Sequence, residues 1–512
     1  MKKSIRLLPG EHWWGGASNL GIKMPFRDGA GYDLRGENFG NQAAPLLLSS
    51  AGRYVWSEKP FRYGFGRGAL AVEGDGPLFV GRAGDTLRAA FREASRRFFP
   101  SKRKMPDPLL FTSPQYNTWI ELMYDQTQAD VLRYARNLIR HGYKPGVLMI
   151  DEGWARYYGD WDFDAVRFPR PKELIRELHR MGFKVMLWIV PFVVPDSRVF
   201  RALRQGNVLV KGADGKPVVR EWWNGHSAVV DVTGGDGLEW FGGQLARLQR
   251  EYGIDGFKFD AGDTPYYRDI DKVAVPTSAN GHTEAFARLG IGHGFNEFRA
   301  CWKCAGLPLV QRLRDRRHSW DHDGMNSLVP NTLAQGLLGY AFVCPDLIGG
   351  GDYESFLDNS GKLDQELFVR YAQASALMPM MQFSAAPWRV LDKRHARLSL
   401  AAAELHGQFA ATILSLAKTS ARTGEPIVRH LTYEFPGCGY ESVTDQFLLG
   451  SGIMAAPVIK KGVRTRSVHV PPGTWKADDG QKFTGPAEIE VKTPLERLPY
   501  FVREPDAKKA CR

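Results

Sequence analysis

The stretch KELIRELHRMGFKVMLWIV, residues 172–190, decides the fold class. In its first half, Leu174, Ile175 and Leu178 recur at the three- to four-residue spacing of one helical face. Gly182 follows as a helix stop signal. The second half, KVMLWIV, is an apolar run rich in Val and Ile, which is typical of a buried strand. A helix followed at once by a buried strand is the repeating unit of a parallel α/β sheet.

The same alternation continues on both sides of this stretch. The segment ADVLRYARNLIRHG (129–142) repeats the helical spacing. Strand candidates recur through the central part of the chain: NTWIEL (117–122), GVLMID (146–151), KVMLWIV (184–190), DGFKFD (255–260), FNEFRA (295–300), PLVQRL (308–313), YAFVCPD (340–346) and MMQFS (380–384). Eight such repeats predict an α/β fold of the (β/α)8 TIM-barrel type. A ninth candidate, SAVVDV (227–232), is assigned to an insertion after the third strand.

The two ends of the chain differ from its centre. The first hundred residues hold short alternating segments broken by Gly, Asn and Pro, and end in an amphipathic helix pattern at 86–98. After the barrel, strand patterns return without helices. Both of these sequence patterns are typical of β-sandwiches. We therefore predict an N-terminal β-sandwich over 1–105, a barrel over 106–430 with a small insertion near 200–232, and a C-terminal β-sandwich over 431–512.

Composition excludes several classes of protein. An apolar share of 43% and a charged share of 24% are ordinary for a globular chain. The longest apolar run, residues 185–195, is far shorter than the roughly 20 residues of a membrane span, so no membrane partner is expected. The N-terminus carries two lysines without an apolar segment behind them, and the five cysteines are odd in number. These features favour a cytoplasmic protein without a disulfide framework.

The net charge of +12 raises the question of a polyanionic partner. The dense basic runs are SKRK (101–104) and RDRR (314–317), and no nucleic-acid-binding motif accompanies them. We therefore expect no nucleic-acid partner. A dispersed basic surface that keeps the protein in solution is the favoured interpretation, and an acidic substrate is a third one.

Carboxylates gather where the predicted strands end. Asp151, Asp260 and Asp346 close three strand candidates, and Asp315 lies just past another. The carboxyl ends of barrel strands meet at one rim, where barrel enzymes place their catalytic groups. Any one of these residues could be a helix cap or a salt-bridge partner, but together they fill one edge. Paired carboxylates suit general acid and nucleophile chemistry on a glycosidic bond.

The motif CWKC (301–304) invites a metal or redox interpretation. A structural zinc site needs four ligands, and neither a second CxxC nor a suitable His pair is present. We therefore interpret these cysteines as buried bystanders and expect no metal and no cofactor.

These strand ends resemble the retaining α-glycosidases of glycoside hydrolase family 31, over nearly the whole chain. GIDGFKFDAGD (253–263) is similar to the family's nucleophile strand. The sixteen-residue interval from Arg299 to Asp315 is similar to the family's run from a sugar-binding Arg to the acid/base Asp. DLIGGG (346–351) looks like the family's DIGG motif.

The resemblance implies double displacement with net retention, with Asp260 as nucleophile and Asp315 as acid/base. It also implies a structural role for Asp346 and a supporting role for Asp263. The substrate-binding residues that it implies are Asp151, Trp188, Trp223, Lys258, Arg299, Arg312, Trp320 and Ser384.

Three of these positions set the chain apart from typical α-glucosidases of the family. Arg312 stands where those enzymes have Trp, and Ser384 where they have His. Lys258 either reaches sugar hydroxyls or pairs with Asp260 or Asp151. The pattern resembles a branch that contains the myogenesis-regulating glycosidase and bacterial α-galactosidases.

The resemblance thus implies an exo-acting retaining α-glycoside hydrolase that releases α-linked galactose from an oligosaccharide or glycoside. An α-glucosidase or α-xylosidase of the same family is the alternative within the enzyme class. A catalytically silent carbohydrate-binding relative is the alternative outside it. The Gln-Gln-Arg-Trp signature of sulfoquinovosidases is not found in the sequence.

Overall fold

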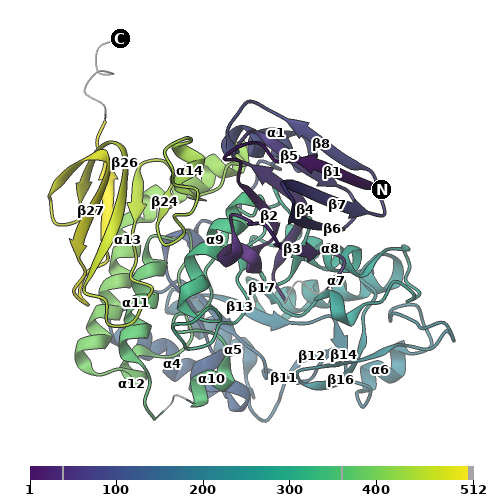
Figure 1. The fold of residues 1–512 in the computed structure, drawn as a ribbon. Helices are drawn as coiled ribbons and strands as arrows, with labels where there is room; N and C mark the ends of the chain where they lie inside the picture. Colours follow the sequence, from purple (N-terminus) through teal and green to yellow (C-terminus); the bar gives the residue numbers. More distant parts are fainter. Residues whose placement is uncertain (37–39, 359–360, 506–512) are drawn as a thin grey trace.

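The computed structural model describes residues 1–36, 40–358 and 361–505. Its centre is a ring of parallel strands in the order β21-β20-β18-β17-β13-β10-β9-β22 (Figure 1). Their bounds are β9 Gln115–Asn117, β10 Val147–Ile150, β13 Lys184–Ile189, β17 Gly256–Phe259, β18 Phe295–Phe298, β20 Gln311–Arg312, β21 Val343–Cys344 and β22 Gln382–Phe383. A parallel bridge between Leu347 and Gln382 joins the two ends of the ring. The predicted (β/α)8 barrel is therefore confirmed.

Helices surround the strands and bury the faces that the sequence marks as apolar. In α5, Leu174, Ile175 and Leu178 are buried as the helical spacing predicts. Thr127 caps the helix α4 through a reciprocal capping box with Asp130. The main barrel helices are α4 Gln128–Arg140, α5 Pro171–Arg180, α7 Gly235–Tyr252, α8 Ala279–Arg288, α9 Leu328–Leu337, α11 Gln365–Ala376 and α13 Lys393–Thr423.

The first barrel strand lies earlier than the predicted segment 117–122. Strand β9 ends at Asn117, and Trp119–Leu122 forms the short helix α3. The Oδ1 atom of Asn117 accepts a hydrogen bond from the backbone N–H of Trp119 at 2.7 Å, and this Asx turn ends the strand. Because a short apolar run fits a strand and a helix equally well, periodicity alone misplaced this element.

An insertion follows β13 and precedes α7, and it includes the ninth strand candidate. It contains the sheet β14-β16-β15 (β14 Phe192–Val193, β15 Val219–Trp222, β16 Gly225–Val229) and the helix α6 Arg198–Leu203. A second small hairpin, β11 Ala155–Tyr157 and β12 Asp160–Phe163, follows β10. Both additions grow from the ends of barrel strands that carry candidate site residues.

The N-terminal region forms two sheets above the barrel in Figure 1. One has the order β1-β7-β6-β3 and the other β19-β4-β5-β8, with β2 paired to β4. The bounds are β1 Lys2–Arg6, β2 Trp13–Ala17, β3 Gly31–Asp33, β4 Gln42–Ser49, β5 Arg53–Ser57, β6 Phe61–Gly66, β7 Ala69–Gly74, β8 Leu78–Arg82 and α1 Leu87–Phe98. Strand β19, Cys301–Trp302, belongs to a barrel loop and pairs in parallel with Gln42 and Ala43 of β4. The first half of the CWKC motif is thus a strand of the N-terminal sheet.

The C-terminal region is a six-stranded antiparallel sheet in the order β23-β24-β25-β28-β26-β27 (Figure 1). Its strands are β23 Val428–Arg429, β24 Phe447–Leu449, β25 Ile453–Ala455, β26 Thr465–Ala477, β27 Lys482–Lys492 and β28 Tyr500–Arg503. Cys511 lies outside the described residues. Among the helices of the described segments, none combines the length and apolar character needed to cross a bilayer.

Candidate active site

A cavity of about 790 Å³ lies where the barrel strands end at their carboxyl termini. Residues that follow different strands line it together, as expected for a barrel rim. Eight of the predicted residues are among them: Asp151, Trp188, Trp223, Lys258, Asp260, Asp263, Arg299 and Asp315.

Asp260 follows β17 and is only 6% exposed. The Nε of Arg299 donates a hydrogen bond to its Oδ1 at 2.9 Å, and the indole N–H of Trp188 donates to its Oδ2 at 2.9 Å. Burial by itself would raise the pKa of this carboxyl, but the positive charges of Arg299 and Lys258 hold the pKa of Asp260 well below its usual range. Asp260 is therefore an ionised carboxylate at neutral pH.

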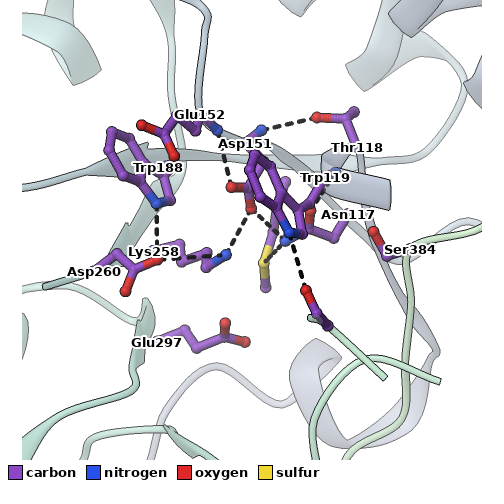
Figure 2. A network of polar contacts seen from close by, with 12 residues as sticks. Asn117, Thr118, Trp119, Asp151, Glu152, Trp188, Lys258, Asp260, Glu297 and Ser384 are labelled. Atoms are coloured by element: carbon purple, nitrogen blue, oxygen red, sulfur yellow. Dashed lines mark hydrogen bonds and ion pairs between the residues drawn. The ribbon is translucent and has the colours of Figure 1, made fainter. Parts of the chain in front are cut away.

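A buried ion pair lies beside this carboxylate (Figure 2). The Nζ of Lys258 donates to Oδ2 of Asp151 at 2.7 Å and lies 3.9 Å from Oδ2 of Asp260. Asn117 donates to the same oxygen of Asp151 at 2.6 Å. Burial would lower the pKa of Lys258, but the two carboxylates outweigh it and raise that pKa. The cation is thus fixed between two acids while it also lines the cavity.

Asp315 follows β20, which is separated from β17 by one strand of the ring, and its side chain is 38% exposed. The Nη1 of Arg312 donates to its Oδ1 at 2.7 Å and to Oδ1 of Asp346 at 2.5 Å. The Nε of Arg312 donates to Glu297 at 3.1 Å. Arg312 is fully buried behind the cavity and holds Asp315 from below rather than lining the space itself.

One guanidinium therefore serves three carboxyl groups. Burial raises the pKa of Asp346 to about 7 in spite of the Arg312 charge, and the neighbouring Asp315 acts in the same direction. Burial likewise raises the pKa of Glu297. The cluster thus holds a proton close to neutral pH, a few ångströms from Asp315.

Besides Arg312, two further predicted substrate-binding residues, Trp320 and Ser384, do not line the cavity. The hydroxyl of Ser384 is fully buried and accepts a hydrogen bond from the backbone N–H of Ile120 at 2.7 Å, so it supports helix α3. In Figure 2 it lies apart from the Asp151–Lys258 pair. The indole N–H of Trp320 donates to Asp364 at 2.9 Å, and the ring packs against the core. Their positions along the sequence gave no indication of where these side chains point.

Sequence reasoning missed several residues that line the cavity: Gly40, Trp119, Tyr124, Glu152, Asn224 and Tyr353. Glu152 directly follows the predicted Asp151, so its place after a strand was a usable signal. Gly40 comes from the N-terminal region and contributes only backbone atoms to the cavity wall. A Cβ atom built on it would lie 1.7 Å from Nη1 of Arg299, and its φ of +62° lies in the left-handed region. A side chain there would require the Arg299 guanidinium to shift, and nothing local in the sequence signals that contact.

Within the described part of the chain, one cluster of His, Cys, Asp or Glu side chains is close enough together to hold a metal ion. Asp321, His322 and Asp323 are the group found there, and Asp321 and His322 are exposed. Cys301 and Cys304 are buried, and among the residues that the structure describes they belong to no cluster of metal-type ligands. The cavity itself thus offers carboxylates, hydroxyls, amides and indoles on a cationic framework, which is a donor set for a polyhydroxylated ligand.

Comparison with known families agrees with this architecture. The profile described as glycosyl hydrolases family 31 TIM-barrel domain matches residues 110–290, and that described as glycosyl hydrolase family 31 C-terminal domain matches residues 424–506. Together the two matches cover just over half of the chain. The chain belongs to glycoside hydrolase family 31.

Individual relatives are similar over most of the chain. It is 32% identical over 431 residues to the myogenesis-regulating glycosidase of Mus musculus. This alignment covers 82% of this chain and 60% of that protein. It is 25% identical over 415 residues to alpha-glucosidase 2 of Bacillus thermoamyloliquefaciens, covering 75% of this chain and 51% of that protein. The chain thus spans between half and two thirds of these relatives. The structure of the Flavobacterium johnsoniae GH31 dextranase FjDex31A superposes with a TM-score of 0.84 at 21% identity, covering 98% of this chain and 66% of that one.

Proposed function

We propose that this chain is an exo-acting retaining α-glycoside hydrolase that releases α-linked galactose from an oligosaccharide or glycoside. One observation carries the proposal: Asp260 and Asp315 line the same cavity in opposite environments. Asp260 is buried and held ionised by cations, whereas Asp315 is accessible and shares the Nη1 atom of Arg312 with the buried Asp346. A nucleophile and an acid need this kind of separation.

In the first step, a carboxylate oxygen of Asp260 attacks the anomeric carbon while Asp315 donates its proton to the glycosidic oxygen. The bond from the anomeric carbon to that oxygen breaks, the aglycone leaves as an alcohol, and the sugar becomes a β-linked ester of Asp260. Trp188 and Arg299, which each bond to one oxygen of Asp260, fix the direction of attack. Asp315 is left as a carboxylate.

In the second step, Asp315 removes a proton from water, and the water oxygen attacks the anomeric carbon from the face that the aglycone left. The ester bond breaks, Asp260 regains its charge, and Asp315 regains its proton. Two inversions restore the α configuration. The reaction consumes one water and requires no further reactant.

The preference for galactose rests on the polar end of the cavity. Asp151 and Lys258 present a fixed carboxylate and a fixed ammonium to the hydroxyls of a terminal sugar. The position of Lys258, two residues before Asp260, also resembles that of a Lys in related α-galactosidases. Arg312 replaces the Trp of typical α-glucosidases of the family. An α-glucoside is the second candidate, because alpha-glucosidase 2 is among the similar proteins.

Initial rates on nitrophenyl α-galactoside, α-glucoside, α-xyloside and α-N-acetylgalactosaminide test the proposal, with Asp260→Asn as the blank. We expect turnover of the galactoside and none in the variant, because an amide cannot form the ester. Dominant turnover of the glucoside or xyloside would overturn the choice of sugar and keep the mechanism. A well-folded Asp260→Asn variant with near-normal rates would overturn the mechanism.

The stereochemistry has its own test. Proton NMR during the first minutes of hydrolysis should show the α-anomer of the free sugar before mutarotation begins. A β-anomer appearing first would contradict double displacement.

A further inference from the structure

A ring of donors surrounds the carboxyl group of Glu152 at the cavity wall. The Tyr158 hydroxyl donates to Oε1 at 2.6 Å, and the indole N–H of Trp223 donates to Oε2 at 3.2 Å. The side-chain amide of Asn224 donates to Oε1 as well and to the Tyr158 oxygen at 2.9 Å. Glu152 is 2% exposed. Nothing in the double-displacement chemistry uses this buried carboxyl.

These donors come from two additions to the barrel. Trp223 and Asn224 form the turn between β15 and β16 of the insertion, and Tyr158 lies in the hairpin β11–β12. Glu152 itself follows β10 and belongs to the barrel. The side chain of Glu152, on the barrel rim, therefore binds both the β11–β12 hairpin and the β15–β16 turn, which are separated by more than sixty residues of sequence.

Trp223 connects Glu152 to the residues around the proposed nucleophile Asp260. Its ring is 45% exposed although it lines the cavity, and the Arg299 guanidinium lies 5.5 Å from the ring centroid. The same guanidinium bonds to Asp260 and Asp263. A continuous set of contacts thus runs from Glu152 through Trp223 and Arg299 to Asp260.

We propose that Glu152 is a positioning residue that fastens the turn at residues 222–225 over the cavity, and that it sets substrate affinity through Trp223. The proposal rests on the proposed glycosidase function for its kinetic part. An indole held at one wall of the cavity offers a large apolar face to a sugar ring at low cost in conformational entropy. Without its acceptor, that indole is free to leave the wall.

The charges around Glu152 suit this role. Asp151 and Asp260 are the carboxylates that act on it, and the hydroxyls of Tyr124 and Tyr158 are its other titratable neighbours. Burial raises the pKa of Glu152 to about 8, and the two carboxylates add to the rise. A protonated carboxyl avoids a third negative charge beside the nucleophile, and its oxygens still accept hydrogen bonds.

A double-mutant cycle on kcat/KM tests the link between Glu152 and Trp223. We expect Glu152→Ala and Trp223→Phe each to raise KM about tenfold, with a smaller effect on kcat, the scale of one lost buried hydrogen bond. If Glu152 acts through the indole N–H, the double variant should be no worse than the more impaired single variant. Independent losses that multiply to about a hundredfold would overturn the proposal.

Glu58→Ala is the matched control. Glu58 also accepts a hydrogen bond from an indole, that of Trp56 at 2.9 Å, but it follows β5 of the N-terminal region and does not line the cavity. Kinetics unchanged from the wild type are expected there.

Hydrogen–deuterium exchange of residues 222–225 gives a measurement that does not depend on turnover. Exchange should be faster in Glu152→Ala than in the wild type or Glu58→Ala. Glu152→Gln keeps one acceptor oxygen and should lie between them, which also protects the test if the Ala variant unfolds. Unchanged exchange in both Glu152 variants would overturn the proposal. If the wild type hydrolyses no glycoside, the proposed function fails, and the exchange result still decides the role of Glu152.

Discussion

The Nη1 atom of Arg312 lies 2.7 Å from Oδ1 of Asp315, so a fully buried guanidinium holds the carboxyl group that faces the cavity. The same nitrogen lies 2.5 Å from Oδ1 of Asp346. Arg312 therefore fixes the orientation of Asp315 and connects it to a buried acid whose pKa is raised to about 7. This arrangement gives Asp315 a fixed direction at the cavity.

Asp315→Asn should separate substrates by their leaving groups. A natural disaccharide needs its leaving oxygen protonated, so kcat/KM should fall by about 10²–10⁴. A nitrophenyl glycoside has a leaving group that departs with little help, so its first step should suffer much less. Equal losses on both substrates would move the acid role elsewhere, and Asp323, which also lines the cavity, would be the next residue to test.

Arg312→Ala should lower the free energy of unfolding by about 3–5 kcal/mol, because it leaves Glu297 and Asp346 buried without their cation. Urea unfolding followed by tryptophan fluorescence measures this. Arg96→Ala removes an exposed helical ion pair with Glu93 and should leave the stability nearly unchanged. Similar small effects in both variants would show that Arg312 is not the centre of a buried charge cluster.

Gly40→Ala should impair activity beyond its effect on the backbone. A methyl group there would lie 1.7 Å from Nη1 of Arg299, which would push the guanidinium off Asp260. Gly29 is the matched control, because it has a φ of +84° and open space around its Cβ position. Both variants should lose about 1–2 kcal/mol of stability from the left-handed backbone, but only Gly40→Ala should lose kcat/KM. Equal kinetics in the two variants would refute the contact.

Glu152→Gln should change how stability depends on pH. The pKa of Glu152 is raised to about 8 in the folded state and is about 4.3 in the unfolded chain. Between these values the folded state holds a proton that the unfolded state has released, so this group makes stability fall as pH rises. The variant should gain relative to the wild type by up to about 1.4 kcal/mol per pH unit across that window. Parallel stability curves from pH 5 to pH 8 would contradict this.

His406→Asn should act in the opposite direction. His406 is buried on α13, its Nδ1–H donates to the Ala376 carbonyl at 3.0 Å, and burial lowers its pKa to about 4. Below about pH 6.5 the unfolded chain binds a proton that the folded state refuses, so stability falls as pH falls toward 4. Asn can keep the donated hydrogen bond but does not titrate. The variant should therefore lose less stability than the wild type between pH 6.5 and 4.5, as measured by urea unfolding.

The sequence predicts the barrel rim well because its geometry follows from strand order. Asp151 and Asp260 each end a recognisable strand, and the ends of parallel strands converge, so their proximity needed no knowledge of side-chain direction. Arg312 was placed at the site, but its role behind Asp315 depends on burial among three acids. Such burial is not encoded in local spacing.

Other features depend on contacts between distant segments. Ser384 ends a strand as predicted, yet its hydroxyl points to the backbone of Ile120. The role of Glu152 as a hydrogen-bond acceptor is seen only once the turn with Trp223 and Asn224 lies against it. The need for a small residue at Gly40 is seen only when Arg299 packs against it. Periodicity and motif spacing carry no information on these tertiary contacts.

The pairing of Cys301 and Trp302 with Gln42 and Ala43 has a consequence for biosynthesis. The ribosome releases β4 early, but the segment that completes this edge of its sheet emerges only after five strands of the barrel have been made. During that interval the backbone groups of Gln42 and Ala43 are an open strand edge, available to the wrong partner. The longer this edge stays open before Cys301 and Trp302 are made, the more opportunity there is for a wrong strand to pair with it.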